Sequence, residues 1–388
     1  MEQVYTTILK RLNNLIVVAN PNGDVEYVSP SVKAMLGFEP NELLGDGWWN
    51  FTKSGEEQTV TFIEYINRLF ESKATNSGTE ITYERQLSTA LGENKWILWN
   101  TSKGPDDTII SIGSDITKRK QAEKELEEKN RNLQQQHEDI IDSIQYARKI
   151  QDAMLPSVKK ITENLSDGFV LYLPKDLVSG DFYWYYKNGS KLFVAVADCT
   201  GHGVPGALMS VMGNSVFKDI VEKGGEEDPA EILKALDAGI NNLLQKEEGY
   251  DVMSDGMDVS LVSIDLSTNR LLFSGAMRPL WVVRNNELIE LKGNRFPIGY
   301  FYGVEKNFTN LELQLEQGDY LYLFSDGYAD QFGGEREKKF NTKKLKELLL
   351  SINSMNGEEQ QGFLEYALKN WRQDIDQTDD VCLLGLQI

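Results

Sequence analysis

The stretch "LFVAVADCTGHGVPGALMS", residues 192–210, decides how the C-terminal half of this chain folds. Six apolar residues predict a buried strand that ends at Asp198, and glycines at positions 201 and 203 interrupt the pattern before a helix begins. A carboxylate at the end of a buried strand loses hydration, which costs free energy unless a partner compensates for it. The sequence therefore raises the question of what partner Asp198 has.

Two further acidic segments share this context. Asp326 ends the strand-like "DYLYLFS", and Asp379 with Asp380 opens "VCLLGLQI". Because the end of one antiparallel strand and the start of its neighbour lie at the same sheet edge, we expect these carboxylates to converge with Asp198. Hard cations offset the repulsion between such carboxylates. With two histidines and two cysteines in the chain, the donor set predicts Mg²⁺ or Mn²⁺ rather than zinc. The alternative is that each Asp merely starts a turn.

Composition narrows the class of protein. A chain of 388 residues with 40% hydrophobic residues suits two or three globular domains. No apolar run approaches the roughly 20 residues of a membrane span, and the first residues lack a secretory signal pattern, so we expect a cytoplasmic protein without membrane insertion. The net charge of −20 disfavours nucleic acid as a partner. We expect Cys199 and Cys382 to be buried apolar residues rather than a disulfide.

A helical segment divides the chain. Residues 117–151 contain no Gly or Pro and predict one long helix that ends before Pro156. A residue suited to an apolar stripe recurs at every seventh position, namely at Leu126, Leu133, Ile140, Ala147 and Met154. The companion seam is polar until its end, at Lys129, Gln136, Ser143 and Ile150. This pattern favours a dimeric, coiled-coil signalling helix over a solvated spacer.

The N-terminal part alternates strand patterns with turn signals. "LIVVANPNGDVEYVS" predicts two strands around a turn, "PSVKAMLGFEPNELLG" predicts short helices, and "GTEITYERQL", "NKWILWNTSK" and "TIISIGSDIT" predict three further strands. Together with "GSDITKRKQAEKEL", this layout resembles a PAS domain, which implies a sensor or dimerisation role; a packing domain without a ligand is the alternative. The region has neither His nor Cys, which argues against His-ligated haem and cysteinyl-flavin chemistry. Noncovalent flavin, a small metabolite or an empty core stay open.

The C-terminal half resembles the SpoIIE-like branch of the PP2C (PPM) metal-dependent protein phosphatases. The motifs "VSGDFYW", "VADCTGHGVPGALMS", "DGMDVSLVSID", "FSDGYADQFGG" and "TDDVCLLGLQI" occur in the family's order. The resemblance implies a PP2C-type α/β/β/α sandwich and protein serine/threonine phosphatase activity. The expected organisation is α+β and multidomain, with a PAS sensor domain at 1–117, a signalling helix at 118–156 and a phosphatase domain at 157–388.

The resemblance also implies a set of site residues. Asp198 would bridge two Mn²⁺ or Mg²⁺ ions, and the main-chain carbonyl of Cys199 would ligate one of them. Asp326 and Asp379 would hold the other ion, and Asp181 would bind metal directly or through water. Such a pair of metals activates a water for in-line attack on the phosphate, so Asp198, Asp326 and Asp379 are the catalytic candidates.

Two further residues have open roles. His202 is a candidate general acid toward the leaving serine oxygen, or a loop residue hydrogen bonded near the metals. Lys175 is a candidate phosphate contact, or a solvated surface charge. Where eukaryotic-type members carry GDSR, this chain has "GAMR" at 275–278, which puts a third metal in doubt. Asp258 either supplies a carboxylate there or caps a strand.

The substrate and the partners are implied by the resemblance alone. SpoIIE-like relatives dephosphorylate a phosphoserine on a STAS-domain anti-sigma-factor antagonist, so we expect a phosphorylated STAS-domain protein as substrate in a partner-switching pathway. We expect a homodimer formed through residues 118–156 and the PAS domain. The alternative function is a signalling scaffold that binds partners without turnover, although a scaffold has no physical need for converging carboxylates.

Overall fold

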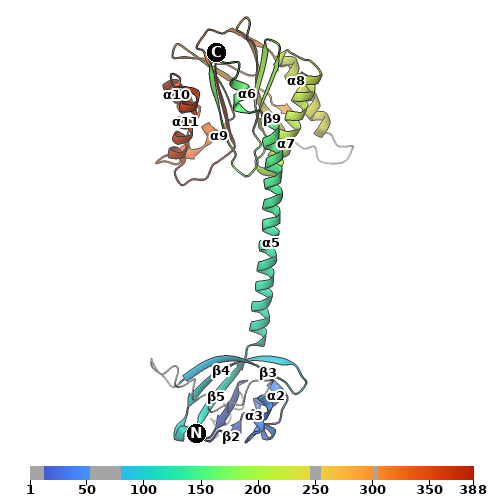
Figure 1. Cartoon of the computed structure of the whole chain (residues 1–388), viewed down its shortest axis with the longest axis vertical. Helices are drawn as coiled ribbons and strands as arrows, with labels where there is room; N and C mark the ends of the chain where they lie inside the picture. The colour runs from blue at the N-terminus through green and yellow to red at the C-terminus, as the bar shows by residue number, and fades with distance from the viewer. Residues whose placement is uncertain (1–12, 53–79, 245–254, 300–304) are drawn as a thin grey trace. The chain divides into compact units, whose positions relative to one another are not determined.

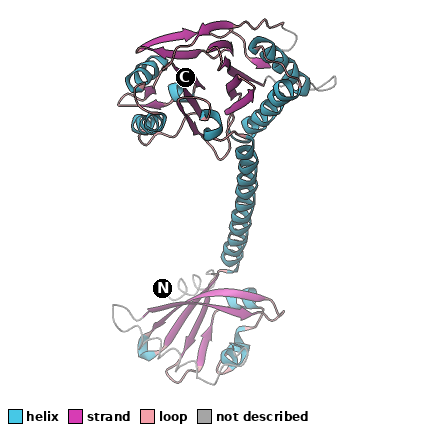
Figure 2. Cartoon of the chain, turned by 45° about the horizontal axis from the view of Figure 1, so that its top comes forward, coloured by secondary structure: helices cyan, strands magenta, loops and turns pink. Residues whose placement is uncertain are grey.

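The computed structural model describes residues 13–52, 80–244, 255–299 and 305–388. The chain divides into two compact units, Met1–His137 and Glu138–Ile388. Both contain antiparallel sheets flanked by helices (Figure 2). Among the described residues, no helix combines the length and the apolar character that a membrane crossing needs.

The first unit is built on a five-stranded antiparallel sheet in the order β2-β1-β5-β4-β3 (Figure 1). Its strands are β1 (Leu15–Ala19), β2 (Val25–Val28), β3 (Glu80–Ser88), β4 (Asn94–Lys103) and β5 (Ile109–Asp115). The short helices are α2 (Ser31–Leu36), η1 (Pro40–Leu43), α3 (Gly47–Thr52) and η2 (Pro105–Asp107). In the β1–β2 turn, the side-chain oxygen of Asn20 accepts the main-chain N–H groups of Asn22 and Asp24, both at 3.0 Å. The five predicted strands and the short helices after β2 are confirmed.

Helix α5 (Thr117–Met154) confirms the predicted long helix. Its first turn is tied to the sheet of the first unit, because Asp115 accepts the N–H of Thr117 at 2.9 Å and Arg119 contacts Glu84 at 2.5 Å. Through these contacts the "DITKRK" segment anchors the start of α5 on the sheet. The stripe predicted for a coiled coil is exposed in the single chain, at Leu126 (60%), Leu133 (62%) and Ile140 (58%).

The second unit stacks two antiparallel sheets. One has the order β14-β10-β9-β8-β7, with β13 also paired to β9. Its strands are β7 (Phe182–Asn188), β8 (Lys191–Cys199), β9 (Gly256–Asp265), β10 (Arg270–Ala276), β13 (Ile298–Gly299) and β14 (Leu311–Gln314). The other sheet has the order β12-β11-β15-β18-β6. Its strands are β6 (Asp167–Leu173), β11 (Leu280–Arg284), β12 (Glu287–Leu291), β15 (Tyr320–Phe324) and β18 (Val381–Gln387).

Helices cover the outer face of each sheet. A core that includes Phe182, Phe217 and Leu236 packs α7 (Gly203–Phe217), η3 (Lys218–Lys223) and α8 (Pro229–Leu244) on the first sheet. A core that includes Trp281, Leu345 and Leu364 packs α9 (Gly327–Asp330), α10 (Thr342–Ile352) and α11 (Gly357–Arg372) on the second. A third core lies between the sheets, so the predicted α/β/β/α sandwich is confirmed. The remaining elements are α6 (Val158–Thr162), β16 (Phe332–Gly333) and β17 (Lys338–Lys339).

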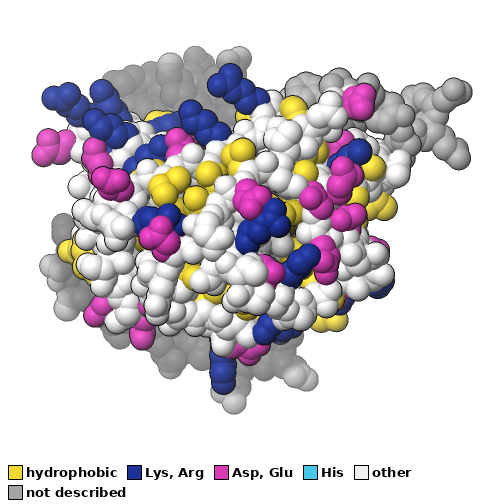
Figure 3. Space-filling model, turned by 90° about the horizontal axis from the view of Figure 1, so that it is seen from above, with side chains coloured by type: hydrophobic (Ala, Val, Ile, Leu, Met, Phe, Trp, Pro, Cys, Tyr) yellow, Lys and Arg dark blue, Asp and Glu magenta, His cyan; other side chains and the backbone are white. Residues whose placement is uncertain are grey.

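Charged side chains of both signs are spread over the face that Figure 3 shows, with apolar side chains between them. The net charge of −20 is therefore not expressed as a uniformly acidic surface on that face.

Candidate functional site

The two-residue period of β8 explains where Asp198 lies. Phe193, Ala195 and Ala197 belong to the core under the helices, whereas Leu192, Val194 and Val196 belong to the core between the two sheets. Asp198 continues the second set, since successive strand residues face opposite sides. Its carboxylate is thus placed at the end of the space between the sheets.

The same period places two more carboxylates there. In β9, Val262 and Ile264 line the core between the sheets, and Asp258 has the same parity. In β7, Tyr183 and Tyr185 do so, and Asp181 precedes them in the same register. Asp258 is also the direct cross-strand partner of Asp198. Two like charges in such a pair destabilise a sheet unless a cation lies between them.

Arg278 supplies that positive charge. Its Nη2 lies 2.8 Å from Oδ2 of Asp198, 3.1 Å from Oδ2 of Asp258 and 2.6 Å from Oδ2 of Asp326. Arg278 comes two residues after the end of β10, and the three carboxylates come from β8, β9 and the residue before α9. One nitrogen therefore joins carboxylates from three separate segments. Asp258 therefore supplies a carboxylate to the cluster, while its role at a third metal stays a prediction.

The carboxylates converge by a different route from the one predicted. β8 belongs to one sheet, whereas β15 and β18 are neighbours in the other, so the three segments do not share one sheet edge. Asp326 approaches Asp198 across the space between the sheets, with its main-chain N–H 3.4 Å from the Asp198 carboxylate. A Cβ at Gly327 would come within 1.9 Å of the Asp380 carbonyl oxygen, so only glycine lets α9 pack this closely on the start of β18.

Asp380 organises the loop that carries Asp181. Its two carboxylate oxygens accept the main-chain N–H groups of Lys175 and Gly180, both at 2.7 Å. The loop is tightly packed there, since a Cβ at Gly180 would come within 2.5 Å of the Gly201 carbonyl oxygen. Asp380 therefore positions the segment, while its neighbour Asp379 lies close enough to Asp326 for the two charges to interact.

Burial dominates the electrostatics of these carboxylates. Burial is the main cause that raises the pKa of Asp198 to about 7. The charge of Arg278 opposes this rise, and the charges of Asp326 and Asp258 add to it. Burial also raises the pKa values of Asp258 and Asp379 above the ordinary range of an Asp. Burial and the Asp198 charge raise the pKa of Asp181 well above it. Each shift has the same direction because both burial and the neighbouring negative charges disfavour the ionised carboxylate.

The oxygen donors of this cluster are of the chemical kind that a hard divalent cation binds. Asp181 is 2% exposed, and its Oδ2 has no hydrogen-bond partner among the described residues, which leaves a buried carboxylate oxygen free to bind a cation. In the described part of the chain, however, no three His, Cys, Asp or Glu side chains stand in an arrangement that could hold a metal. The ligand roles of Asp181, Asp198, Cys199, Asp326 and Asp379 therefore stay predictions.

The two cysteines are buried, as predicted, and both are free thiols. Burial raises the pKa values of both thiols well above the ordinary range. The Cys382 N–H donates to Ser325 Oγ at 3.0 Å, so this residue ties β18 to the end of β15. The Cys199 carbonyl lies beside Gly180, the residue before Asp181, and is 3.4 Å from where a Cβ on Gly180 would be.

The structure brings Lys175 and His202 together. Lys175 Nζ lies 3.0 Å from His202 Nε2, and His202 Nδ1 lies 2.7 Å from Oδ2 of Asp176. His202 is the N-cap residue of α7, between Gly201 (φ 81°) and Gly203 (φ 65°). These left-handed glycines turn the chain from β8 into the helix and hold the imidazole at the surface. The motifs did not indicate Asp176, although it directly follows Lys175 in the sequence.

Residues 188–388, over half of the chain, match the family model described as Stage II sporulation protein E (SpoIIE). The chain belongs to the SpoIIE family. Residues 13–118 match a PAS domain model. The chain is similar to the solved SiaA PP2C domain of Pseudomonas aeruginosa, with 32% identity and a TM-score of 0.59 over 65% of this chain and 98% of that one. The resemblances to PAS domains and to SpoIIE-like PP2C phosphatases are thereby confirmed.

A curated relative of this SpoIIE-family chain is the phosphoserine phosphatase RsbU of Bacillus subtilis (strain 168). It is 24% identical over 203 residues, which cover 52% of this chain and 56% of RsbU. The match thus spans little more than half of the length of that relative. These similarities identify the C-terminal part of the chain as a PP2C-type domain of the SpoIIE family.

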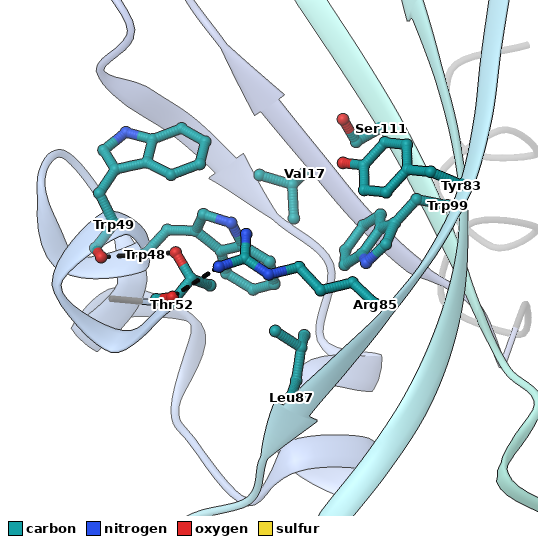
Figure 4. A pocket seen from close by; sticks show the side chains of 9 residues that line it. All are labelled: Val17, Trp48, Trp49, Thr52, Tyr83, Arg85, Leu87, Trp99 and Ser111. Atoms are coloured by element: carbon teal, nitrogen blue, oxygen red, sulfur yellow. Dashed lines mark hydrogen bonds between the residues drawn. The ribbon is translucent and has the colours of Figure 1, made fainter. Parts of the chain in front are cut away.

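The PAS domain of this SpoIIE-family chain has a small pocket between α3 and the sheet (Figure 4). Arg85 extends from β3 into it, and its Nη2 donates to the Thr52 carbonyl at 2.7 Å. Trp48 and Trp99 meet edge to face beside it, with ring centroids 5.7 Å apart. The cavity volume is about 20 Å³, room for about one water molecule.

Proposed function

We propose that this chain is a PAS-regulated, metal-dependent protein serine/threonine phosphatase, organised as a sensor domain at 1–117, a signalling helix at 118–156 and a phosphatase domain at 157–388. The observation that carries the proposal is the convergence of carboxylates from both sheets at one end of the sandwich, where a buried Asp181 oxygen has no partner among the described residues. The similarity to a relative named as a phosphoserine phosphatase supports it.

The proposed cofactors are two Mn²⁺ or Mg²⁺ ions. Asp198 would contact both, and Asp181, Asp326, Asp379 and the Cys199 carbonyl would complete their protein ligands. When bound, such ions supply water activation and charge neutralisation at a phosphate. The chain's contribution is to hold these oxygens in place: Asp380 fixes the Asp181 loop, and the Ser325–Cys382 contact joins the two strands that lead to Asp326 and Asp379.

His202 would donate a proton to the leaving serine oxygen. Its Nδ1 lies 2.7 Å from the Asp176 carboxylate, which fixes the ring, and Nε2 would carry the transferred proton. Lys175 lies 3.0 Å from this Nε2 and would place a positive charge beside the phosphate. Both side chains are partly exposed, in keeping with a site that receives a phosphorylated residue of another protein.

The proposed substrate is a phosphoserine on a STAS-domain anti-sigma-factor antagonist. The resemblance to SpoIIE-like phosphatases supports this assignment. The proposed assembly is a homodimer through residues 118–156 and the PAS domain. The exposed stripe of Leu126, Leu133 and Ile140 supports it, because a partner helix with the same stripe would cover these side chains.

One observation favours the alternative of a scaffold without turnover: Arg278 occupies the position among the carboxylates where a cation is expected. The two functions are separated by measuring p-nitrophenyl phosphate hydrolysis by the full chain in EDTA and after addition of Mn²⁺. We expect hydrolysis that requires Mn²⁺. Equal rates under both conditions would exclude the metal-dependent mechanism, and no hydrolysis under either would favour the scaffold. A phosphoproteomic comparison with and without the gene would then identify the substrate.

A further inference from the structure

Arg278 is the only basic residue in ion-pair contact with Asp198, Asp258 and Asp326 among the described residues. Its side chain is 16% exposed, and one nitrogen, Nη2, makes all three contacts. Three carboxylates around a single guanidinium nitrogen leave net negative charge in the cluster. In the described structure, Arg278 is therefore the counter-ion on which the neutralisation of these carboxylates depends.

The loop after β10 carries Arg278, and its backbone is held in an unusual conformation that positions the guanidinium. Met277 has φ 63°, a left-handed conformation that a non-glycine residue adopts at a cost, and the N–H of Arg278 donates to the Ala276 carbonyl at 2.7 Å. Gly275 and Gly293 close on the Arg278 carbonyl, where added Cβ atoms would come within 2.3 and 2.5 Å of it. The surrounding packing over-determines this turn, so the position of Arg278 is imposed by the fold.

The guanidinium is nevertheless incompletely satisfied. Its Nε is buried and has no hydrogen-bond acceptor among the described residues. An arginine whose role is purely structural commonly uses its planar fork in two parallel bonds to one carboxylate, as Arg284 does with Asp319 at 2.8 and 2.6 Å. Arg278 instead directs a single nitrogen at three acids. Arg278 therefore acts on the carboxylates as a single positive charge and not as a bidentate hydrogen-bond donor.

We infer that Arg278 is an internal cation that competes with divalent metal for the carboxylate cluster. This inference rests on the proposed function and deepens it. Nη2 contacts Oδ2 of Asp198 and Oδ2 of Asp326, carboxylate oxygens of two residues proposed to bind metal. A divalent ion and the guanidinium repel each other when both contact these oxygens, so each weakens the binding of the other. Metal binding therefore has to overcome the Arg278 contacts, and Arg278 raises the metal concentration at which the site fills.

The test compares Mn²⁺ binding to the full-length wild-type chain and to Arg278→Gln, by calorimetric titration of EDTA-stripped protein without substrate. We expect Arg278→Gln to bind Mn²⁺ at least about tenfold more tightly, a difference of about 1.4 kcal/mol. We also expect its unfolding temperature to fall in EDTA and to recover with Mn²⁺, because the carboxylates then lack any other cation. Arg278→Lys keeps the charge and should give an intermediate affinity.

Arg284→Gln is the matched control, since it removes an arginine paired with Asp319 and Glu316 outside the cluster. It should lower the unfolding temperature without changing Mn²⁺ affinity. Equal or weaker Mn²⁺ binding by Arg278→Gln would overturn the competition, because loss of a merely structural arginine would not tighten metal binding. Absence of Mn²⁺ binding to every variant, wild type included, would also overturn the metal requirement of the proposed function, so the two failures are distinguishable.

Discussion

Gln151 on α5 and Ser179 exchange two hydrogen bonds. Nε2 of Gln151 donates to the Ser179 carbonyl at 2.7 Å, and its Oε1 accepts the Ser179 N–H at 3.1 Å. The same Nε2 contacts Ser210 Oγ of α7 at 2.8 Å, and Ser179 Oγ accepts the N–H of Asp181 at 3.1 Å. Gln151 is the buried residue of α5. The end of the helix is therefore hydrogen bonded to the segment that carries a proposed metal ligand.

Replacing Gln151 tests this link. Gln151→Ala leaves the Ser179 main chain and Ser210 without these partners in a buried place, so we expect a loss of roughly 1–3 kcal/mol in the free energy of unfolding. We also expect a lower phosphatase rate, because the Asp181 loop loses its support. Urea unfolding and p-nitrophenyl phosphate hydrolysis measure the two effects. Gln134→Ala, at an exposed position of α5 outside both seams, is the control and should change neither.

Asp198→Asn tests catalysis. The substitution removes the proposed shared ligand while keeping the side-chain shape, so hydrolysis in Mn²⁺ should fall to background and the far-ultraviolet circular dichroism should stay that of the wild type. Asp265→Asn, at the opposite end of the neighbouring strand β9, is the matched control and should retain activity. Hydrolysis by Asp198→Asn at the wild-type rate would exclude the proposed role of Asp198.

The Asp176–His202 pair tests proton transfer to the leaving group. Because p-nitrophenolate leaves without protonation and a serine alkoxide does not, His202→Ala should slow hydrolysis of a phosphoserine peptide by about 10²–10⁴-fold but leave p-nitrophenyl phosphate hydrolysis nearly unchanged. Asp176→Asn should show a smaller loss of the same kind, since it removes only the group that orients the ring. Equal losses on both substrates would mean that His202 has a structural role.

The apolar stripe of α5 tests dimerisation. Leu133→Asn combined with Ile140→Asn places amides in the proposed helix seam, so the double variant should dissociate at protein concentrations where the wild type is a dimer, and its phosphatase activity should respond differently to deletion of the PAS domain. Sedimentation velocity and a hydrolysis assay give the two results. Arg131→Asn, exposed on the same helix outside the stripe, is the control. A double variant that stays dimeric with unchanged regulation would reduce the helix to a spacer.

Asp115 tests how the sheet of the first unit holds the start of α5. Burial tends to raise the pKa of Asp115, but hydrogen bonds from Thr117 and the contact with Lys95 lower it below its usual range. In the unfolded chain the pKa of an Asp is about 4. Because the pKa of Asp115 is lower in the folded protein, its ionised form stabilises the fold above about pH 4, and this stabilisation is lost as the pH falls through the pKa of the folded state. Asp115→Ala should therefore cost about 1 kcal/mol near neutral pH, the usual net contribution of a hydrogen bond, and progressively less in acid. A cost that does not change with pH would contradict this account.

Local patterns in the sequence were sufficient for the elements and for part of the site. The alternation in "LFVAVAD" reports a strand whose even residues face one side, and the residues without Gly or Pro at 117–151 report a helix, because these periods are properties of the backbone itself. The acidic ends of three strand-like segments likewise indicated that Asp198, Asp326 and Asp379 belong together. Their meeting across two sheets, rather than along one edge, was not expected, since sheet membership depends on pairing between distant strands.

The tertiary structure alone decided which partners these carboxylates have. Arg278 is 80 residues from Asp198 and 48 from Asp326, and the "GAMR" segment was notable in the sequence only for the acid that it lacks. Asp258 meets Asp198 through the register of β8 and β9, and Gln151 reaches Ser179 only because α5 packs beside α7. No local period encodes such contacts, because they arise from strand register and from the stacking of sheets and helices. The sequence by itself determined that buried acids needed a cation, and the packing of the two sheets determined that an arginine of the same chain lies among them.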